Sequence, residues 1–172
     1  MSDPPPKLLE AIGLVAVRWA GLETIIEISC AYLLKYQASQ SAAHPTPTAF
    51  SQRVKFLRRS LGEPLFVHLR PEFYAALDET LALSRKRNDI MHGAFIKWHG
   101  ETGGDQIIIR AASTGHIADA NNLSVETLQN LALEMQSMFG KHFNLQDRLK
   151  ALIRGFEGGA DIGRRASFGG RQ

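Results

Sequence analysis

The sequence has a single cysteine, Cys30, among its 172 residues. One thiol excludes an internal disulfide framework and any zinc cluster built from several cysteines, and it suggests a reducing compartment. The chain also lacks a run of ~20 uncharged apolar residues, which a membrane span needs. Its start, Met1–Pro6, is acidic and rich in proline, whereas a signal peptide begins with basic residues. We therefore expect a cytoplasmic protein with no membrane contact.

Several familiar catalytic patterns are missing as well. The sequence contains no glycine-rich phosphate loop, no HExxH pair and no nucleophile elbow, so we expect neither a metal nor another cofactor. The balance of 20 basic against 17 acidic side chains gives a net charge of +3. Such a mild excess is compatible with a nucleic-acid partner without requiring one.

Two long segments have apolar side chains at alternating steps of three and four residues, the spacing of one helix face. The first segment covers residues 7–36, and the second begins at a capping serine, Ser124. Two such helices at opposite ends of the chain predict a helical bundle. The predicted faces are Leu8, Ile12, Val15, Trp19, Leu22, Ile26 and Leu33 in the first helix, and Leu128, Leu131, Met135, Met138, His142, Leu145, Leu149 and Leu152 in the last.

Two shorter helices are expected between them. One runs from Phe50 to Gly62 and carries basic residues away from its apolar face, which predicts either a solvated surface or a phosphate-binding one. The other runs from Pro71 to His92, and its inward face becomes polar toward the C-terminal end. The basic residues of the former are Arg53, Lys55, Arg58 and Arg59, and the inward face of the latter is Tyr74, Leu77, Leu81, Ser84, Asn88 and Met91.

A β-hairpin is predicted before the last helix, from the β-rich segments 94–98 and 106–110 and the glycine-containing turn between them. The expected fold is thus an all-α, up-and-down bundle of four to five helices with a small inserted hairpin. We expect one domain over residues 7–154 and a flexible tail, rich in glycine and arginine, over residues 155–172.

The candidate for chemistry lies at the end of the third helix, in residues 84–93. Arg87 and His92 are the reagents that metal-free RNA cleavage needs, because imidazole moves protons near neutral pH and guanidinium binds phosphate oxygens. Asn88 lies four residues before His92, where it shares the helix face of the imidazole and is placed to orient it. Arg87 and His92, five residues apart, diverge on a continuous helix. Either the helix ends near His92, or a second subunit brings the two groups together.

Other interpretations of these residues remain open. A histidine beside Gly93 at a helix C-terminus complements the helix dipole, and Arg85, Lys86 and Arg87 are also favourable as cations of a last turn. A second spacing match, Arg110 to His116, has nothing that fixes its geometry. A DNA-binding helix-turn-helix is disfavoured, because the predicted helices are too long and the pattern of a recognition helix is absent.

The segment Arg87-Asn88-Asp89-Ile90-Met91-His92 resembles the Arg-polar-x-x-x-His signature of the HEPN superfamily of small helical bundles. The layout is also similar: a long first helix containing Trp19-Ala-Gly-Leu-Glu23, the motif at the end of a central helix, and a long closing helix.

This resemblance implies a metal-independent endoribonuclease, of the kind found in toxin–antitoxin and defence systems. It implies catalytic roles for Arg87, His92 and Asn88, with Glu23 as a partner for the arginine. It also implies a homodimer with a shared cleft, RNA as the substrate, and an antitoxin or nucleotidyltransferase as a further partner. We assign RNA binding to Arg85, Lys86, Arg58 and Arg59. The alternative is a non-catalytic HEPN-like module that binds a nucleotide, RNA or a protein.

Overall fold

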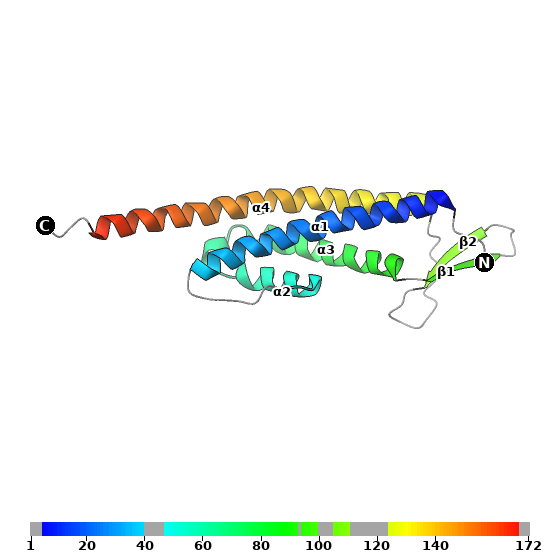
Figure 1. Cartoon of the computed structure of the whole chain (residues 1–172), viewed down its shortest axis with the longest axis horizontal. Coiled ribbons are helices and arrows are strands. Elements are labelled where there is room, and N and C mark those ends of the chain that lie inside the picture. Colours follow the sequence, from blue (N-terminus) through cyan, green and yellow to red (C-terminus); the bar gives the residue numbers. More distant parts are fainter. Residues whose placement is uncertain (1–4, 40–46, 93, 100–104, 111–123, 169–172) are drawn as a thin grey trace. The chain divides into compact units, whose positions relative to one another are not determined.

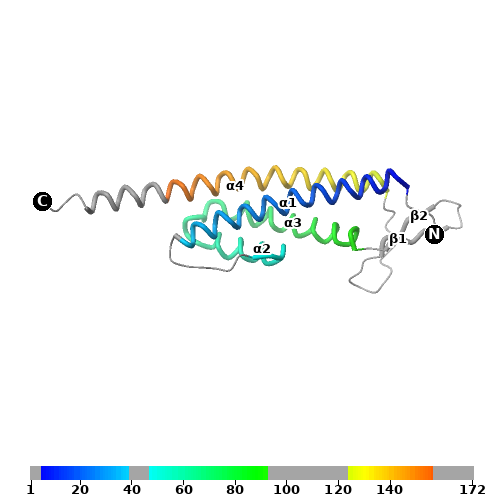
Figure 2. Tube along the Cα trace, in the orientation of Figure 1, coloured from blue at the N-terminus to red at the C-terminus, as the bar shows by residue number. Residues whose placement is uncertain are grey.

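The computed structural model shows an all-α helical bundle (Figure 1). It describes residues 5–39, 47–92, 94–99, 105–110 and 124–168, with side chains for 5–38, 47–92 and 124–156 (Figure 2). The helical elements are α1 (Pro6–Ser39), α2 (Phe50–Ser60), the 3₁₀ turn η1 (Pro64–Phe66), α3 (Arg70–Met91) and α4 (Val125–Phe168). Strands β1 (Ala94–His99) and β2 (Asp105–Arg110) pair antiparallel, with Ala94 opposite Arg110 and His99 opposite Asp105.

The apolar face predicted for α1 is confirmed. Of its seven members only Ile12 is partly exposed, and the others are buried. Pro6 is the first residue of the helix, where a missing N–H costs no hydrogen bond. Burial of Ala11, Ile25 and Tyr36 widens this face beyond a narrow seam. Helix α1 therefore buries apolar side chains along most of its length.

Helix α4 begins as predicted and ends later. The Thr127 N–H donates to Oγ of Ser124 at 3.0 Å, which caps the helix. The predicted face is buried from Leu128 to Leu149, whereas Leu152 is partly exposed and Ile153 is buried instead. The helix then continues to Phe168, into the segment predicted as a flexible tail, and the flexibility of that segment stays a prediction. Extending an existing helix fixes one residue for each new hydrogen bond, and this tolerates glycines that would prevent nucleation.

The buried face of α3 differs from the predicted one. Tyr74, Leu81 and Ser84 are only half-buried, and Asn88 and Met91 are exposed. The side chains on the buried face are Phe73, Ala76, Leu77, Thr80, Leu83 and Ile90, with Arg87 half-buried in line with them. The true face is rotated by about 90°, close to one residue step, from the predicted one. The C-terminal half of α3 has few apolar residues, so Arg87 occupies an inward position through its aliphatic stem.

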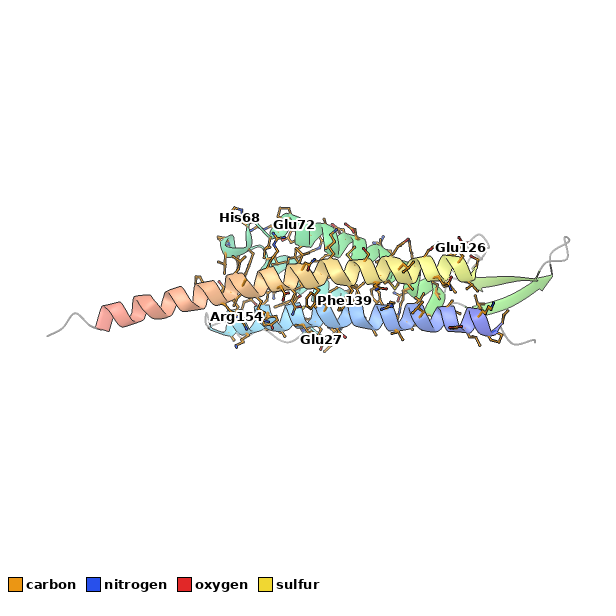
Figure 3. All side chains as sticks on the ribbon, turned by 90° about the horizontal axis from the view of Figure 1, so that it is seen from above. Glu27, His68, Glu72, Glu126, Phe139 and Arg154 are labelled. Carbon is orange, nitrogen blue, oxygen red and sulfur yellow. The ribbon has the colours of Figure 1, made fainter. Side chains whose placement is uncertain are left out.

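By its internal contacts, the expected single domain divides into two compact units. Unit 1 comprises residues 1–22 and 78–139, which include the first part of α1, the last part of α3, the hairpin and the first part of α4. Its helices meet through Lys86 and Glu134, and through Gly21, where an added Cβ would lie 3.8 Å from the Phe139 ring. Phe139 is labelled in Figure 3, where its side chain lies between α4 and α1.

Unit 2 comprises residues 23–77 and 140–172. Here the second part of α1, helix α2, the first part of α3 and the second part of α4 form a four-helix arrangement. The contacts that join these helices are Glu27 with Arg53, Gln37 with Ser60, Arg58 with Tyr74, Phe73 with His142, and Tyr36 with Phe156.

Arg70 holds the turn that follows α2. Its Nε donates to the carbonyl of Leu61 at 3.0 Å, and its Nη2 donates to those of Gly62 at 2.6 Å and Glu63 at 3.3 Å. These carbonyls lie beyond the last turn of α2 and have no partner within that helix. One side chain at the start of α3 therefore satisfies three acceptors and fixes the path of the chain between the two helices.

Cys30 is buried in unit 2, and its Sγ lies 3.8 Å from the Arg53 carbonyl, to which it donates. Burial raises the pKa of this thiol to about 12. Among the helices that the structure describes, none combines the length and the apolar character needed to cross a bilayer.

Candidate functional site

Arg87 is the most constrained polar residue of the predicted motif. It lies on the inward side of α3, half-buried, between Leu83 and Ile90. Its Cζ is 5.9 Å from the centroid of the Trp19 ring on α1, and its Nη1 donates to Oδ1 of Asn88 at 2.9 Å. Arg87 Nε is buried and has no hydrogen-bond partner among the described residues. The guanidinium is thus held against α1, and one of its N–H groups has no partner among the described residues.

Trp19 provides the surface on which this cation rests. The indole is almost completely buried in unit 1, and its position on the α1 face was predicted from the sequence. A guanidinium near an aromatic ring is stabilised by the ring quadrupole, with about 0.5–2 kcal/mol depending on how far water is excluded. Sequence reasoning missed this contact between α1 and α3, because it placed Arg87 away from the buried face.

His92, unlike Arg87, is exposed. It follows the last residue of α3, and its side chain is open to solvent. Its backbone N–H donates to the Asn88 carbonyl at 2.9 Å, so the helical hydrogen-bond pattern extends to His92. On a helix that is regular up to this point, Arg87 and His92 diverge by about 140°. The helix end therefore does not by itself bring the two side chains of one chain together.

Asn88 holds the arginine in this structure rather than the imidazole. Its exposed side-chain oxygen accepts from Arg87, and its backbone carbonyl accepts from the His92 N–H. The predicted role in orienting the imidazole therefore has no support from the hydrogen bonds of the described residues.

The two neighbouring cations are both exposed. Lys86 Nζ lies 3.0 Å from Oε2 of Glu134 on α4, an exposed ion pair that contributes roughly 0.2–1 kcal/mol. Arg85 lies seven residues before His92, so it shares the helix face of the imidazole about two turns away. Arg85 is thus the cation that the helix itself aligns with His92.

The remaining predicted residues belong to unit 2. Arg59 is exposed at the end of α2, with its Cζ 5.9 Å from the Phe56 ring centroid, and Arg58 is half-buried with its Cζ 5.3 Å from that of Tyr74. Glu23 is half-buried on α1. Since Arg87 lies in unit 1, the pairing of Glu23 with Arg87 stays a prediction, as does a shared role for the two groups of arginines.

Two of the surface cavities that described residues of a single unit form are large, and neither includes Arg87 or His92. The cavity in unit 1 has a volume of about 620 Å³, and the one in unit 2 about 590 Å³. The former is lined by Lys7, Glu10, Ala11, Gly13, Leu14, Val17, Val125 and Gln129, and the latter by Leu65, His68, Leu69, Arg148, Ala151, Leu152, Gly155 and Phe156. Within the described ranges, no three His, Cys, Asp or Glu side chains are grouped to hold a metal ion.

Comparison of the chain with known protein families, with curated proteins and with solved structures finds no match.

Proposed function

We propose that the chain is a cytoplasmic, metal-independent endoribonuclease of the HEPN type, a toxin or defence enzyme that acts as a homodimer. In this proposal the chain is an up-and-down helical bundle with a hairpin inserted before α4. The observation that supports a nuclease site is the set of contacts made by the Arg87 guanidinium. This cation is held against Trp19 and Asn88, yet a buried N–H of its guanidinium remains without a partner among the described residues.

Cleavage of RNA without a metal needs a proton carrier and a fixed positive charge. His92 takes the proton of a 2′-hydroxyl, whose oxygen attacks the adjacent phosphorus, and returns a proton to the leaving 5′-oxygen. Arg87 binds the phosphate oxygens, on which negative charge grows in the transition state. The products are a 2′,3′-cyclic phosphate and a 5′-hydroxyl. Arg85 and Lys86 add positive charge for the flanking phosphates.

The divergence of Arg87 and His92 on α3 supports a site made by two copies. Arg87 of one protomer then faces His92 of its partner, and the two-fold axis repeats the pair. The two pairs would then line a cleft that both chains form. An antitoxin or a nucleotidyltransferase would act by covering this cleft.

The test of catalysis compares three purified proteins on mixed RNAs in EDTA: the wild type, Arg87→Ala and His92→Ala. We expect cleavage by the wild type alone, with products that carry a cyclic phosphate. Equal cleavage by all three, or by none, contradicts the proposal. RNA binding without any product would favour the non-catalytic module instead.

Mixing the two inactive variants tests the shared site. A heterodimer of Arg87→Ala and His92→Ala regains one intact site, so random exchange of subunits restores about a quarter of the wild-type activity. A monomer in light scattering at the assay concentration, or no recovery after mixing, would contradict a shared site.

A further inference from the structure

One side of α1 in unit 1 is both apolar and exposed, and we call it the α1 face. It contains Leu14 and Val17, and Val17 is 68% exposed. Both residues line the cavity of about 620 Å³ that α1 shares with α4, and Figures 1 and 3 show the two helices side by side. On α4, Leu133 is 62% exposed and lies one turn beyond Gln129, which lines the same cavity. Neighbouring apolar side chains that are exposed to this extent mark an interaction surface.

The α1 face is separate from the seat of Arg87. Leu14 lies five residues before Trp19 in the sequence, which is about 140° around the helix. Trp19 is the residue of α1 that the Arg87 guanidinium contacts. A partner that covers Leu14 therefore occupies a different side of α1 from the proposed cleft.

Two charges of opposite sign flank Leu14. Glu10 lies four residues before it and Arg18 four residues after it, so each is about 6 Å away along the helix axis and about 40° around it. Both side chains are exposed, and neither forms an ion pair with another described residue. A two-fold axis through Leu14, perpendicular to α1, places Glu10 of each of two antiparallel helices level with Arg18 of the other. The charges of the α1 face are thus complementary to those of a second copy.

The same axis matches a large side chain with a small one. Val17 lies three residues after Leu14 and Ala11 three residues before it, so Val17 of each copy lies level with Ala11 of the other. Ala11 lines the cavity between α1 and α4, which Gly13 also lines, and an added Cβ at Gly13 would meet nothing within 4 Å. The cavity therefore has room for the Val17 side chain of a second copy.

We propose that two copies of the chain associate through the α1 face, with their α1 helices antiparallel about a two-fold axis at Leu14. Leu133 on α4 extends the contact beside α1. This contact goes beyond the proposed cleft and does not depend on it, and chains that use both contacts form an assembly of four. An anionic lipid surface fits the α1 face less well, because it would repel Glu10.

The experiment measures the molar mass by light scattering over a range of protein concentrations, roughly 1–100 µM. Glu10→Arg and Arg18→Glu each replace two attractive pairs across the axis by two repulsive ones. We expect either variant to associate about 100-fold more weakly than the wild type, about tenfold for each pair. The control, Lys35→Glu, reverses an exposed charge of α1 in unit 2 and should associate like the wild type. Circular dichroism confirms that each protein is folded.

Two rescue measurements are specific to a two-fold contact. The double variant Glu10→Arg/Arg18→Glu restores both pairs with their signs exchanged, and an equimolar mixture of the two single variants restores both pairs between unlike chains. We expect both samples to associate like the wild type. A loss that neither sample restores overturns the proposal, as do unchanged single variants or an equal loss in Lys35→Glu. A wild type that stays monomeric, with or without binding to phosphatidylglycerol vesicles, also overturns it.

Arg18→Glu also separates this contact from the proposed cleft. A change from four chains in the wild type to two in the variant supports both contacts. A change from two chains to one supports the α1 face and overturns the shared cleft. A wild-type dimer that remains a dimer in Arg18→Glu overturns only the α1 face. Cleavage of RNA in EDTA is measured independently, since Arg18 has no part in the cleavage chemistry.

Discussion

Replacing Arg87 by methionine separates a functional role of the guanidinium from a structural one. Methionine keeps an unbranched apolar stem on the inward face of α3 but removes the charge and all the donors. Two stabilising contacts are lost. The cation–π contact with Trp19 contributes about 0.5–2 kcal/mol, and the exposed hydrogen bond to Asn88 contributes about 0.5–1.5 kcal/mol.

A third effect has the opposite sign. The buried Nε of Arg87 has no partner among the described residues, and an unsatisfied buried donor costs about 1–3 kcal/mol. Removing it offsets most of the two losses. We therefore expect the free energy of unfolding of Arg87→Met to lie within about 1 kcal/mol of the wild-type value, since the opposing contributions are of similar size. We expect RNA cleavage to be abolished in the same protein.

Urea unfolding followed by circular dichroism measures this free energy. Leu22→Ala is the control for the sensitivity of the assay, because Leu22 is completely buried and its truncation costs about 2–5 kcal/mol. A loss of more than about 2 kcal/mol in Arg87→Met would refute the reasoning, since it would make Arg87 a structural residue whose substitution says nothing about catalysis.

Two further predictions concern unit 2. Arg70→Met leaves the carbonyls of Leu61 and Gly62 without the Arg70 donor, whereas the Glu63 carbonyl still accepts from the Phe66 N–H. The free energy of unfolding should therefore fall by about 2–3 kcal/mol, and Arg70→Lys should recover part of it. Equal stability of the methionine variant and the wild type in urea would contradict this. Cys30 supplies the second prediction. Its thiol keeps its proton in the folded state up to about pH 12, whereas the unfolded thiol loses it near pH 9. The contribution of Cys30 to the free energy of unfolding is therefore complete below pH 9 and declines as the pH rises toward 12. Urea unfolding at pH 8 and pH 10 should show this decline in the wild type relative to Cys30→Ala, and a pH-independent difference between the two proteins would exclude it.

The sequence was sufficient to predict the helices with a continuous apolar pattern. Seven of the eight residues predicted for the face of α4 are buried, because apolar side chains recur there in nearly every turn and only His142 interrupts them. In α3 the apolar pattern weakens after Leu83. Met91 was included in the predicted inward face, but its side chain is exposed. Arg87 was assigned to the outer face for the same reason, because a pattern of apolar residues does not reveal an arginine that buries its aliphatic stem.

The candidate site was predictable in composition but not in geometry. The grouping of Arg87, Asn88 and His92 is visible in the sequence, whereas the seat of Arg87 on Trp19 depends on how α1 and α3 pack. Likewise, the partner of Lys86 is Glu134, 48 residues away. Contacts between distant segments follow from the tertiary fold, so local spacing in one sequence does not determine them.

The burial of Cys30 also makes the wild-type chain a convenient host for chemical labels. Maleimides and related reagents attack the thiolate of an accessible cysteine, and Cys30 is both 2% exposed and protonated at neutral pH. A cysteine introduced at an exposed position, such as Lys55→Cys on α2, is then the thiol that takes the label. Spectroscopic probes can thus be attached to the outer side of α2 while Cys30 stays in place.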